Sequence, residues 1–237
     1  MAVITLDISQ GGDGKFHDQV YDRLSAALIQ GQFPPLKSVS LRSLAQDLGV
    51  SPMPVREAVR RLIAEKALEL QPSNKRLRVP ELTEQRLGQL LKARQWVEPE
   101  LAALAAPRMT REMIKRLKDD DNKLMQALTK GDVSGYMQAN QDFHFTIYGR
   151  GDADLFYDMA RTLWLQVGPF MRVVFGRLGT VHLPKDHHQD MIKAFEAGDA
   201  EAARACMSAD IGEGMQLMMD AIRAHEVEDK SRRKRAK

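Results

Sequence analysis

The sequence predicts a mainly α-helical protein, with an N-terminal winged helix-turn-helix followed by a C-terminal all-α helical bundle. Two amphipathic segments meet at Gly49, and two β-prone runs follow them around a polar turn. From residue 81 onward, apolar residues recur at helical spacing and nothing alternates convincingly with a period of two. We expect four regions: a flexible lead-in (1–14), the first domain (15–80), the bundle (81–226) and a basic disordered tail (227–237).

The first domain is predicted to begin with a helix over residues 15–30, because apolar residues recur there at helical spacing. A second, short helix begins at Leu41 and stops at Gly49. Ser51 is positioned to cap the third helix. Pro52 and Pro54 are compatible with that helix because backbone N–H groups of a first turn have no intrahelical partner to lose.

A β-hairpin is predicted after the third helix, with strands at 68–71 and 76–79 around a tip at 72–75. Lys75 and Arg76 lie at this tip and the start of the second strand, a placement of charge that is typical of the wing of a winged helix. An ordinary helical subdomain with solvated arginines is the competing interpretation of the same pattern.

The bundle is expected to begin beyond Pro80, which ends the last strand, with Thr83 as the cap of its first helix. Glycines and prolines separate the later helical patterns, and Gly168-Pro169 predicts a bend in one of them. The expected helices cover residues 83–106, 110–130, 133–149, 153–177, 185–197 and 199–226.

The charge distribution indicates a nucleic-acid reader joined to a domain that does not touch DNA. Residues 1–80 carry 11 Lys and Arg against 8 Asp and Glu, residues 81–226 carry 18 against 22, and residues 227–237 carry 6 against 2. No apolar run approaches a membrane span and no export signal is evident, so no membrane partner is expected. The single cysteine fits a reducing compartment, and we expect a soluble, cytoplasmic protein.

The run from Leu44 to Ser51, followed by Pro54 to Leu62, closely resembles the DNA-binding domain of GntR-family bacterial transcription regulators. The rest of the chain resembles the FCD (FadR-like) type of effector domain. This resemblance implies a ligand-responsive regulator that binds a palindromic DNA operator as a homodimer, with a small organic acid effector in the helical pocket. It leaves open the effector, the operator sequence, and whether the protein acts as a repressor or an activator.

The resemblance also implies which residues face DNA. The candidates are Arg42, Ser51, Met53, Arg56 and Arg60 of the helix-turn-helix, with Lys75 and Arg76 of the wing. The chain departs from the family pattern at Leu36, where a glycine is usual, and at Pro52, where an arginine is usual. We therefore expect an operator that departs from the family's usual half-site at the base which that arginine would read.

A metal site is implied by four residues of the bundle. Asn140 and His144 lie four apart on one helical face, and His188 matches a further histidine of the family pattern. Asp210 stands where the final histidine is expected. Such a donor set suits one Zn, Ni or Mn ion per subunit, and the competing interpretation is a polar, metal-free pocket.

Arg94 and Glu98 match a recurring pair of FCD domains, and the resemblance favours a buried Arg94 that grips the carboxylate of the effector. Arg172 is a further candidate for effector binding. The competing interpretation of Arg94 and Glu98 is a surface ion pair of little energetic consequence.

The alternative function is a metal-dependent helical-bundle enzyme with an accessory DNA-binding module. The sequence disfavours it, because the two expected histidine ligands come without the paired Glu-x-x-His motifs of di-iron bundles and without an evident general base. We therefore expect a protein that is not an enzyme.

Overall fold

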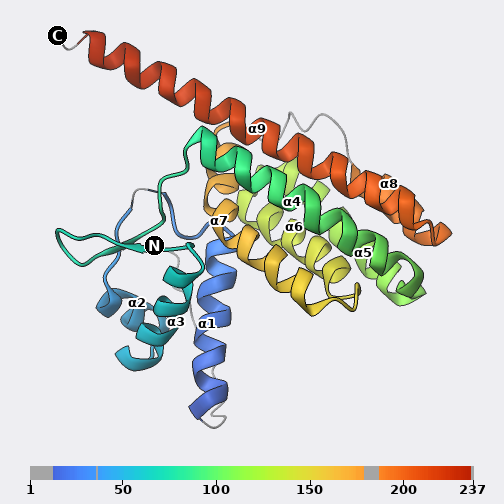
Figure 1. The fold of residues 1–237 in the computed structure, drawn as a ribbon, viewed down its shortest axis with the longest axis horizontal. Helices are drawn as coiled ribbons and strands as arrows, with labels where there is room; N and C mark the ends of the chain where they lie inside the picture. The colour runs from blue at the N-terminus through green and yellow to red at the C-terminus, as the bar shows by residue number, and fades with distance from the viewer. Residues whose placement is uncertain (1–12, 36, 179–186, 236–237) are drawn as a thin grey trace.

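A computed structural model describes residues 13–35, 37–178 and 187–235 of the chain. The predicted fold class is confirmed: a small helical domain with a two-stranded wing lies at one end, and an all-α bundle forms the rest (Figure 1). The expected lead-in up to residue 12 and the departure at Leu36 lie outside the described residues.

The helix-turn-helix consists of α2 (Leu41–Leu48) and α3 (Pro52–Ala64), supported by α1 (Asp13–Ile29). Ser40 caps α2 by accepting a hydrogen bond from the backbone N–H of Ser43 at 3.0 Å. Gly49 ends α2 with φ +67°, a left-handed conformation that favours glycine. The sequence therefore fixes both ends of this short helix locally.

The wing is an antiparallel pair of short strands, β1 (Glu69–Leu70) and β2 (Leu77–Arg78). Leu77 also pairs with Val39 through two backbone hydrogen bonds of 2.8 Å, which attach the wing to the segment before α2. The strands are shorter than predicted, but the hairpin and its tip lie where the sequence indicated.

The bundle follows the predicted order of helices. Its elements are α4 (Glu84–Ala105), the short 3₁₀ helix η1 (Ala106–Arg108), α5 (Arg111–Lys130), α6 (Val133–Tyr148), α7 (Asp154–Leu178), α8 (His187–Ala197) and α9 (Ala200–Arg235). Thr83 caps α4 as expected, by accepting from the N–H of Arg86 at 3.2 Å. Helices α4 and α9 run side by side along the bundle (Figure 1).

The last helix differs from the prediction. A disordered tail was expected from residue 227, but α9 continues to Arg235 and extends beyond the bundle (Figure 1). Its final stretch is rich in Glu, Lys and Arg, which all favour helix, and no glycine or proline interrupts it before Arg235.

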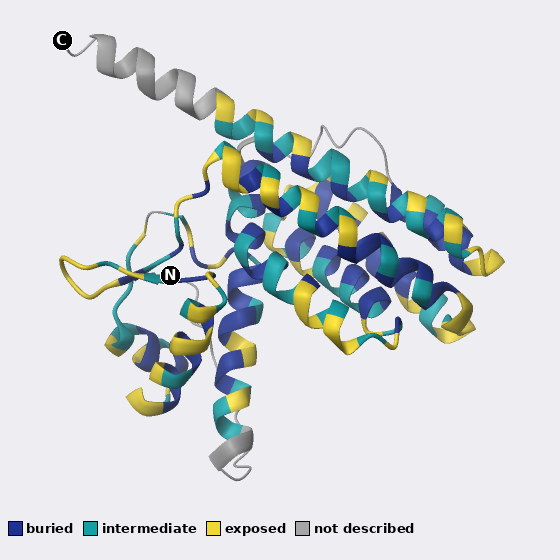
Figure 2. Cartoon of the chain, viewed as in Figure 1, coloured by how far each residue is buried: buried dark blue, intermediate teal, exposed yellow. Residues whose placement is uncertain are grey.

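The two domains meet along α1 and α7, and buried residues run without interruption from α1 into the bundle (Figure 2). Gly168 of α7 lies against the backbone of Ile29. A Cβ atom added at Gly168 would stand 2.3 Å from the carbonyl oxygen of Ile29, so only glycine permits this contact. Two residues earlier on α7, Gln166 Nε2 donates to the carbonyl oxygen of Glu65 at 3.1 Å. The junction is therefore a packed interface.

Candidate metal centre and DNA-facing surface

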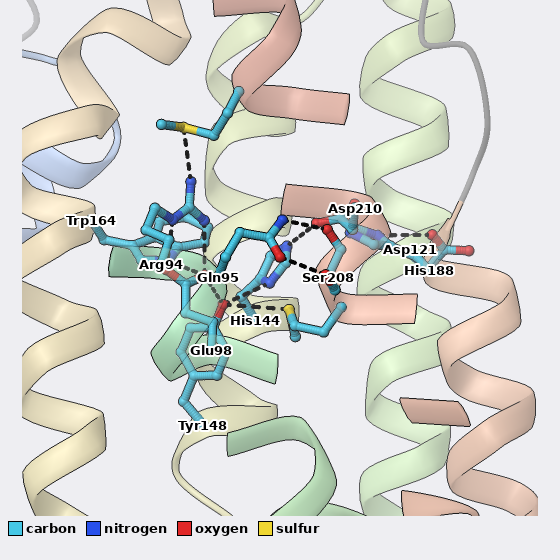
Figure 3. Close-up of polar contacts among 12 residues, drawn as sticks. Arg94, Gln95, Glu98, Asp121, His144, Tyr148, Trp164, His188, Ser208 and Asp210 are labelled. Atoms are coloured by element: carbon cyan, nitrogen blue, oxygen red, sulfur yellow. Dashed lines mark hydrogen bonds and ion pairs between the residues drawn. The ribbon is translucent and has the colours of Figure 1, made fainter. Parts of the chain in front are cut away.

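Three helices bring His144, His188 and Asp210 together inside the bundle (Figure 3). One ligand atom from each residue lies within 4.8 Å of the others. His144 Nε2 is 3.3 Å from Asp210 Oδ2, and His188 Nε2 is 3.7 Å from Asp210 Oδ1. Ligands placed at about 2.1 Å around a tetrahedral ion stand about 3.4 Å apart, so this spacing fits a single small cation.

The other nitrogen of each ring lies near a polar side chain. His144 Nδ1 lies 3.0 Å from the hydroxyl of Tyr148, and this hydroxyl donates to Glu98 Oε2 at 2.5 Å. We therefore assign the proton of His144 to Nδ1, which donates to the Tyr148 oxygen. His188 Nδ1 lies 3.4 Å from Asp121 Oδ1, so a carboxylate stands beside this ring nitrogen.

The electrostatics keep these groups in their metal-ligating forms. Burial lowers the pKa of His144, so its imidazole is neutral at pH 7. Burial alone would raise the pKa of Asp210. Contact with His144, together with the nearby His188 and Arg94, lowers that pKa instead, so Asp210 is ionised. A lone pair on His144 Nε2 then faces a carboxylate oxygen, and a cation between them would relieve the repulsion.

Asn140, the fourth predicted ligand, is buried on α6, one turn before His144. Its amide oxygen therefore comes from the same helix as the first histidine and remains a candidate for the fourth position. The residues that are present, two imidazoles and one carboxylate with an amide nearby, fit a divalent ion of the Zn, Ni or Mn type.

Arg94 and Glu98 form a buried ion pair, and the surface alternative is wrong. Arg94 is 4% exposed and Glu98 is 0% exposed. Arg94 Nε donates to Glu98 Oε1 at 2.6 Å, and its Nη2 donates to Glu98 Oε2 at 2.8 Å. Burial alone would lower the pKa of Arg94, but the charge and hydrogen bonds of Glu98 raise it, so the guanidinium stays charged.

Glu98 is also the acceptor for Tyr148 and for Trp164, whose Nε1–H donates to Oε2 at 3.1 Å (Figure 3). Its carboxylate therefore has four donors and is not available to an effector. Arg94 Nη1 is directed at Met215 Sδ, 3.6 Å away, so its outer edge faces a weak acceptor.

Arg172 lies away from this cluster, contrary to the prediction. Its Nη2 donates to Ser134 Oγ at 2.8 Å, at the start of α6, and its side chain packs over Gly31. Ser134 precedes His144 by ten residues, roughly 15 Å along a helix. Arg172 instead packs at the contact between the end of α1 and the bundle.

Asp121, Tyr148 and Trp164 also belong to this site, although no sequence pattern was used to predict them. Tyr148 follows His144 by four residues, so helical spacing could have indicated it. Asp121 and Trp164 carry no such local signal, because they reach the site through contacts between helices.

The predicted DNA-facing residues are largely exposed, but only some of their side chains already have hydrogen-bond or ion-pair partners within the protein. Arg42 and Arg56 are exposed and make no hydrogen bond or ion pair with any other described residue. Arg60 pairs with Glu57 of its own helix at 3.2 Å. Arg76 Nη2 donates to the carbonyl oxygen of Ser38 at 2.9 Å, so it also holds the wing in place.

Lys75, Ser51 and Met53, the remaining predicted DNA-facing residues, are also exposed. Lys75, at the wing tip, has φ +54°, a left-handed conformation within a tight turn. Ser51 precedes α3 with an extended backbone, and its hydroxyl makes no capping hydrogen bond.

Within the described ranges, no helix is both long and apolar enough to cross a membrane.

Comparison with protein families identifies both parts of the chain. The family described as "Bacterial regulatory proteins, gntR family" matches residues 16–74, and the FCD domain family matches residues 89–213. The HTH-type transcriptional regulator McbR of Escherichia coli K12 is 29% identical over 192 residues, which cover 80% of this chain and 86% of McbR. The Uxu operon regulator of Haemophilus influenzae is 26% identical over 183 residues, which cover 70% and 67% of the two chains.

Two solved structures resemble the whole fold. The E. coli McbR/YncC structure superposes with a TM-score of 0.77 at 28% identity, covering 89% of this chain and 98% of that one. A putative transcriptional regulator GntR from Rhodococcus sp. RHA1 gives a TM-score of 0.67 at 21% identity, covering 86% and 98%. The second likeness concerns the fold alone.

Proposed function

The chain belongs to the GntR family of bacterial transcription regulators, in the group that carries an FCD domain, and from this premise we propose that it binds a palindromic operator as a homodimer. The named relatives are regulators and not enzymes, which argues against the metal-dependent enzyme as an alternative function. One helix-turn-helix per chain offers one recognition helix, and two chains related by a twofold axis would read two half-sites.

We further propose that one divalent ion is held by His144, His188 and Asp210, with Asn140 as a fourth ligand. When it is five- or six-coordinate, such an ion keeps open positions beside these four ligands for the carboxylate of a small organic acid. The observation that carries this proposal is the convergence of two Nε2 atoms on one ionised carboxylate.

The charges around the centre make the ion a condition for binding an acid. Within the pocket, the charge of Arg94 is cancelled by its partner Glu98. Asp121 and Asp210 then leave the pocket negative, which disfavours an anion. A divalent cation neutralises both carboxylates, so we expect the effector to bind only after the metal.

We propose that helix α7 transmits a structural change in this pocket to the DNA-binding domain. Trp164 donates to Glu98 inside the pocket, while Gln166 and Gly168 contact the first domain on the same helix. A change around Glu98 that moves Trp164 would therefore also move the contact between α7 and α1. Regulation requires that the ligand bind two arrangements of this contact with unequal affinity.

Gly168→Ala tests this route. The added Cβ would overlap the backbone of Ile29, and we expect the free energy of unfolding to fall by about 1–3 kcal/mol, as overpacking usually causes. We also expect the operator affinity of the variant to respond less to metal removal than that of the wild type. Urea unfolding and binding titrations measure the two effects.

Gly88→Ala is the matched control, because Gly88 is also helical but an added Cβ there meets nothing within 4 Å. This variant is expected to be unchanged or more stable by about 0.5–1 kcal/mol, and to keep the response to metal removal. Equal behaviour of the two variants would contradict the proposed role of the α1–α7 contact.

Arg56→Ala tests the recognition surface. Arg56 is exposed on α3 without an ion-pair partner among the described residues, so it is free for a bidentate contact with guanine. We expect specific operator binding to weaken by about 1–3 kcal/mol, with little change in binding to unrelated DNA. Fluorescence anisotropy on an operator selected from a random duplex library measures both affinities.

Arg60→Ala is the control on the same helix. Because Arg60 forms an ion pair with Glu57, we expect its substitution to lower the specific affinity for the operator less than Arg56→Ala does. If Arg56→Ala leaves the specific affinity unchanged, α3 does not dock on DNA as proposed here.

A further inference from the structure

We infer that Met53 recognises the 5-methyl group of a thymine in each operator half-site. This inference rests on the proposed docking of α3 in the major groove and adds the kind of base that its first turn reads. Met53 is the second residue of α3, and the residue is 61% exposed. Recognition helices contact base edges with their N-terminal residues, so this side chain would face the bases.

Met53 shares the outer face of α3 with Arg56 and Arg60, which follow it by three and seven residues. The opposite face, with Val55, Ala58 and Leu62, is buried against the rest of the domain. An exposed apolar side chain beside exposed arginines suits a surface that is both negatively charged and locally apolar. The major groove of DNA has both properties, because phosphates line its edges and each thymine presents a methyl group on its floor.

The backbone of this turn cannot replace an apolar contact with hydrogen bonds. The first helical residue is Pro52 and the third is Pro54, and neither has an N–H group. Among the first three residues, Met53 alone keeps a backbone donor, which weakens the usual capacity of a helix N-terminus to bind phosphate. Direct reading at this point therefore depends on the side chains of Pro52, Met53 and Ser51.

The Ser51 hydroxyl makes no capping hydrogen bond and is therefore available for a contact with DNA. A serine cap usually accepts from the N–H of the second or third helical residue, and Pro54 has removed one of these donors. Ser51 is exposed and makes no capping bond, so its hydroxyl is free to meet a phosphate beside the groove. Met53 is then left to make the apolar contact with the base.

The test replaces thymine with deoxyuridine, which removes only the methyl group. An operator is first selected with the full-length protein from a random library of double-stranded DNA. Each thymine is then replaced singly, and affinity is measured by fluorescence anisotropy. At one position per half-site we expect uracil to weaken binding about fourfold, the value of one buried methyl-sized group, and about 15-fold when both half-sites are changed.

Met53→Ala should remove this difference, so that the variant binds thymine and uracil operators equally. Met125→Ala, an exposed methionine on α5 of the bundle, should retain the full difference. The inference is overturned if no thymine position responds to uracil, or if the response persists in Met53→Ala. It is also overturned if Met53→Ala binds the operator with the affinity of the wild type. That result would indicate that the exposed Met53 contacts a protein partner and not DNA.

These outcomes are separable from a failure of the proposed function. A protein that enriches no sequence from the library lacks specific DNA recognition, which overturns both proposals. An operator that is enriched, but is indifferent to uracil, overturns the thymine contact alone.

Discussion

Glu98→Ala is expected to destabilise the protein by about 3–5 kcal/mol, because it leaves the buried Arg94 cation without its partner. The substitution also removes the acceptor of Tyr148 and Trp164, two further buried donors. Urea unfolding followed by far-UV circular dichroism measures the change. Glu201→Ala, at a pair on α9 whose acidic side chain is 81% exposed, is the control and should cost less than about 1 kcal/mol.

A combined Arg94→Met and Glu98→Leu variant distinguishes the loss of a partner from the loss of packing. Replacing a buried ion pair with apolar residues of similar volume is often nearly neutral, so this variant should be more stable than Glu98→Ala alone. Equal stability of Glu98→Ala and the wild type would mean that Arg94 is solvated, contrary to the buried pair described here.

Zinc is expected to stabilise the wild type and not His144→Ala. An ion that binds only the folded state at 100 times its dissociation constant adds about 2.7 kcal/mol. For a chain of this size, that raises the melting temperature by roughly 5–10 °C. Protein purified without a His-tag and treated with EDTA is melted alone and with added Zn, Ni or Mn.

His187→Ala is the matched control for this experiment. His187 adjoins His188, but its Nε2 lies 2.8 Å from Glu213 and it is not a member of the cluster. This variant should retain the zinc response. If zinc raises the melting temperature of His144→Ala as much as that of the wild type, the ion binds elsewhere and the pocket is metal-free.

The sequence predicts the helices well because their boundaries depend on local chemistry. Thr83, Gly49 and Gly131 end or begin helices through caps and left-handed turns that neighbouring residues determine. The family pattern likewise identified His144, His188 and Asp210 correctly as neighbours, although they come from three helices.

The parts that sequence reasoning missed depend on packing between distant segments. Arg172 has the right charge for an effector anchor, but α7 turns it towards Ser134 and away from the histidines. Glu98 resembles a binding residue in sequence, and only the fold reveals that it is enclosed by Arg94, Tyr148 and Trp164 (Figure 3).

The same limit applies to the recognition surface. Arg56 and Arg60 look equivalent in the sequence, because both are arginines on the free side of α3. The ion pair with Glu57 makes them unequal, and its side-chain geometry is not determined by spacing alone.

The most direct test of the central claim is a pair of binding titrations on the selected operator and on a scrambled duplex, each with zinc and after chelation. We predict that the operator binds at least about 1,000-fold more tightly than the scrambled duplex at physiological salt. We also predict that chelation changes operator affinity by at least about fivefold and leaves the scrambled duplex unaffected. Equal affinity for the two duplexes would contradict specific DNA recognition, and an operator affinity that chelation leaves unchanged would contradict control by the metal pocket.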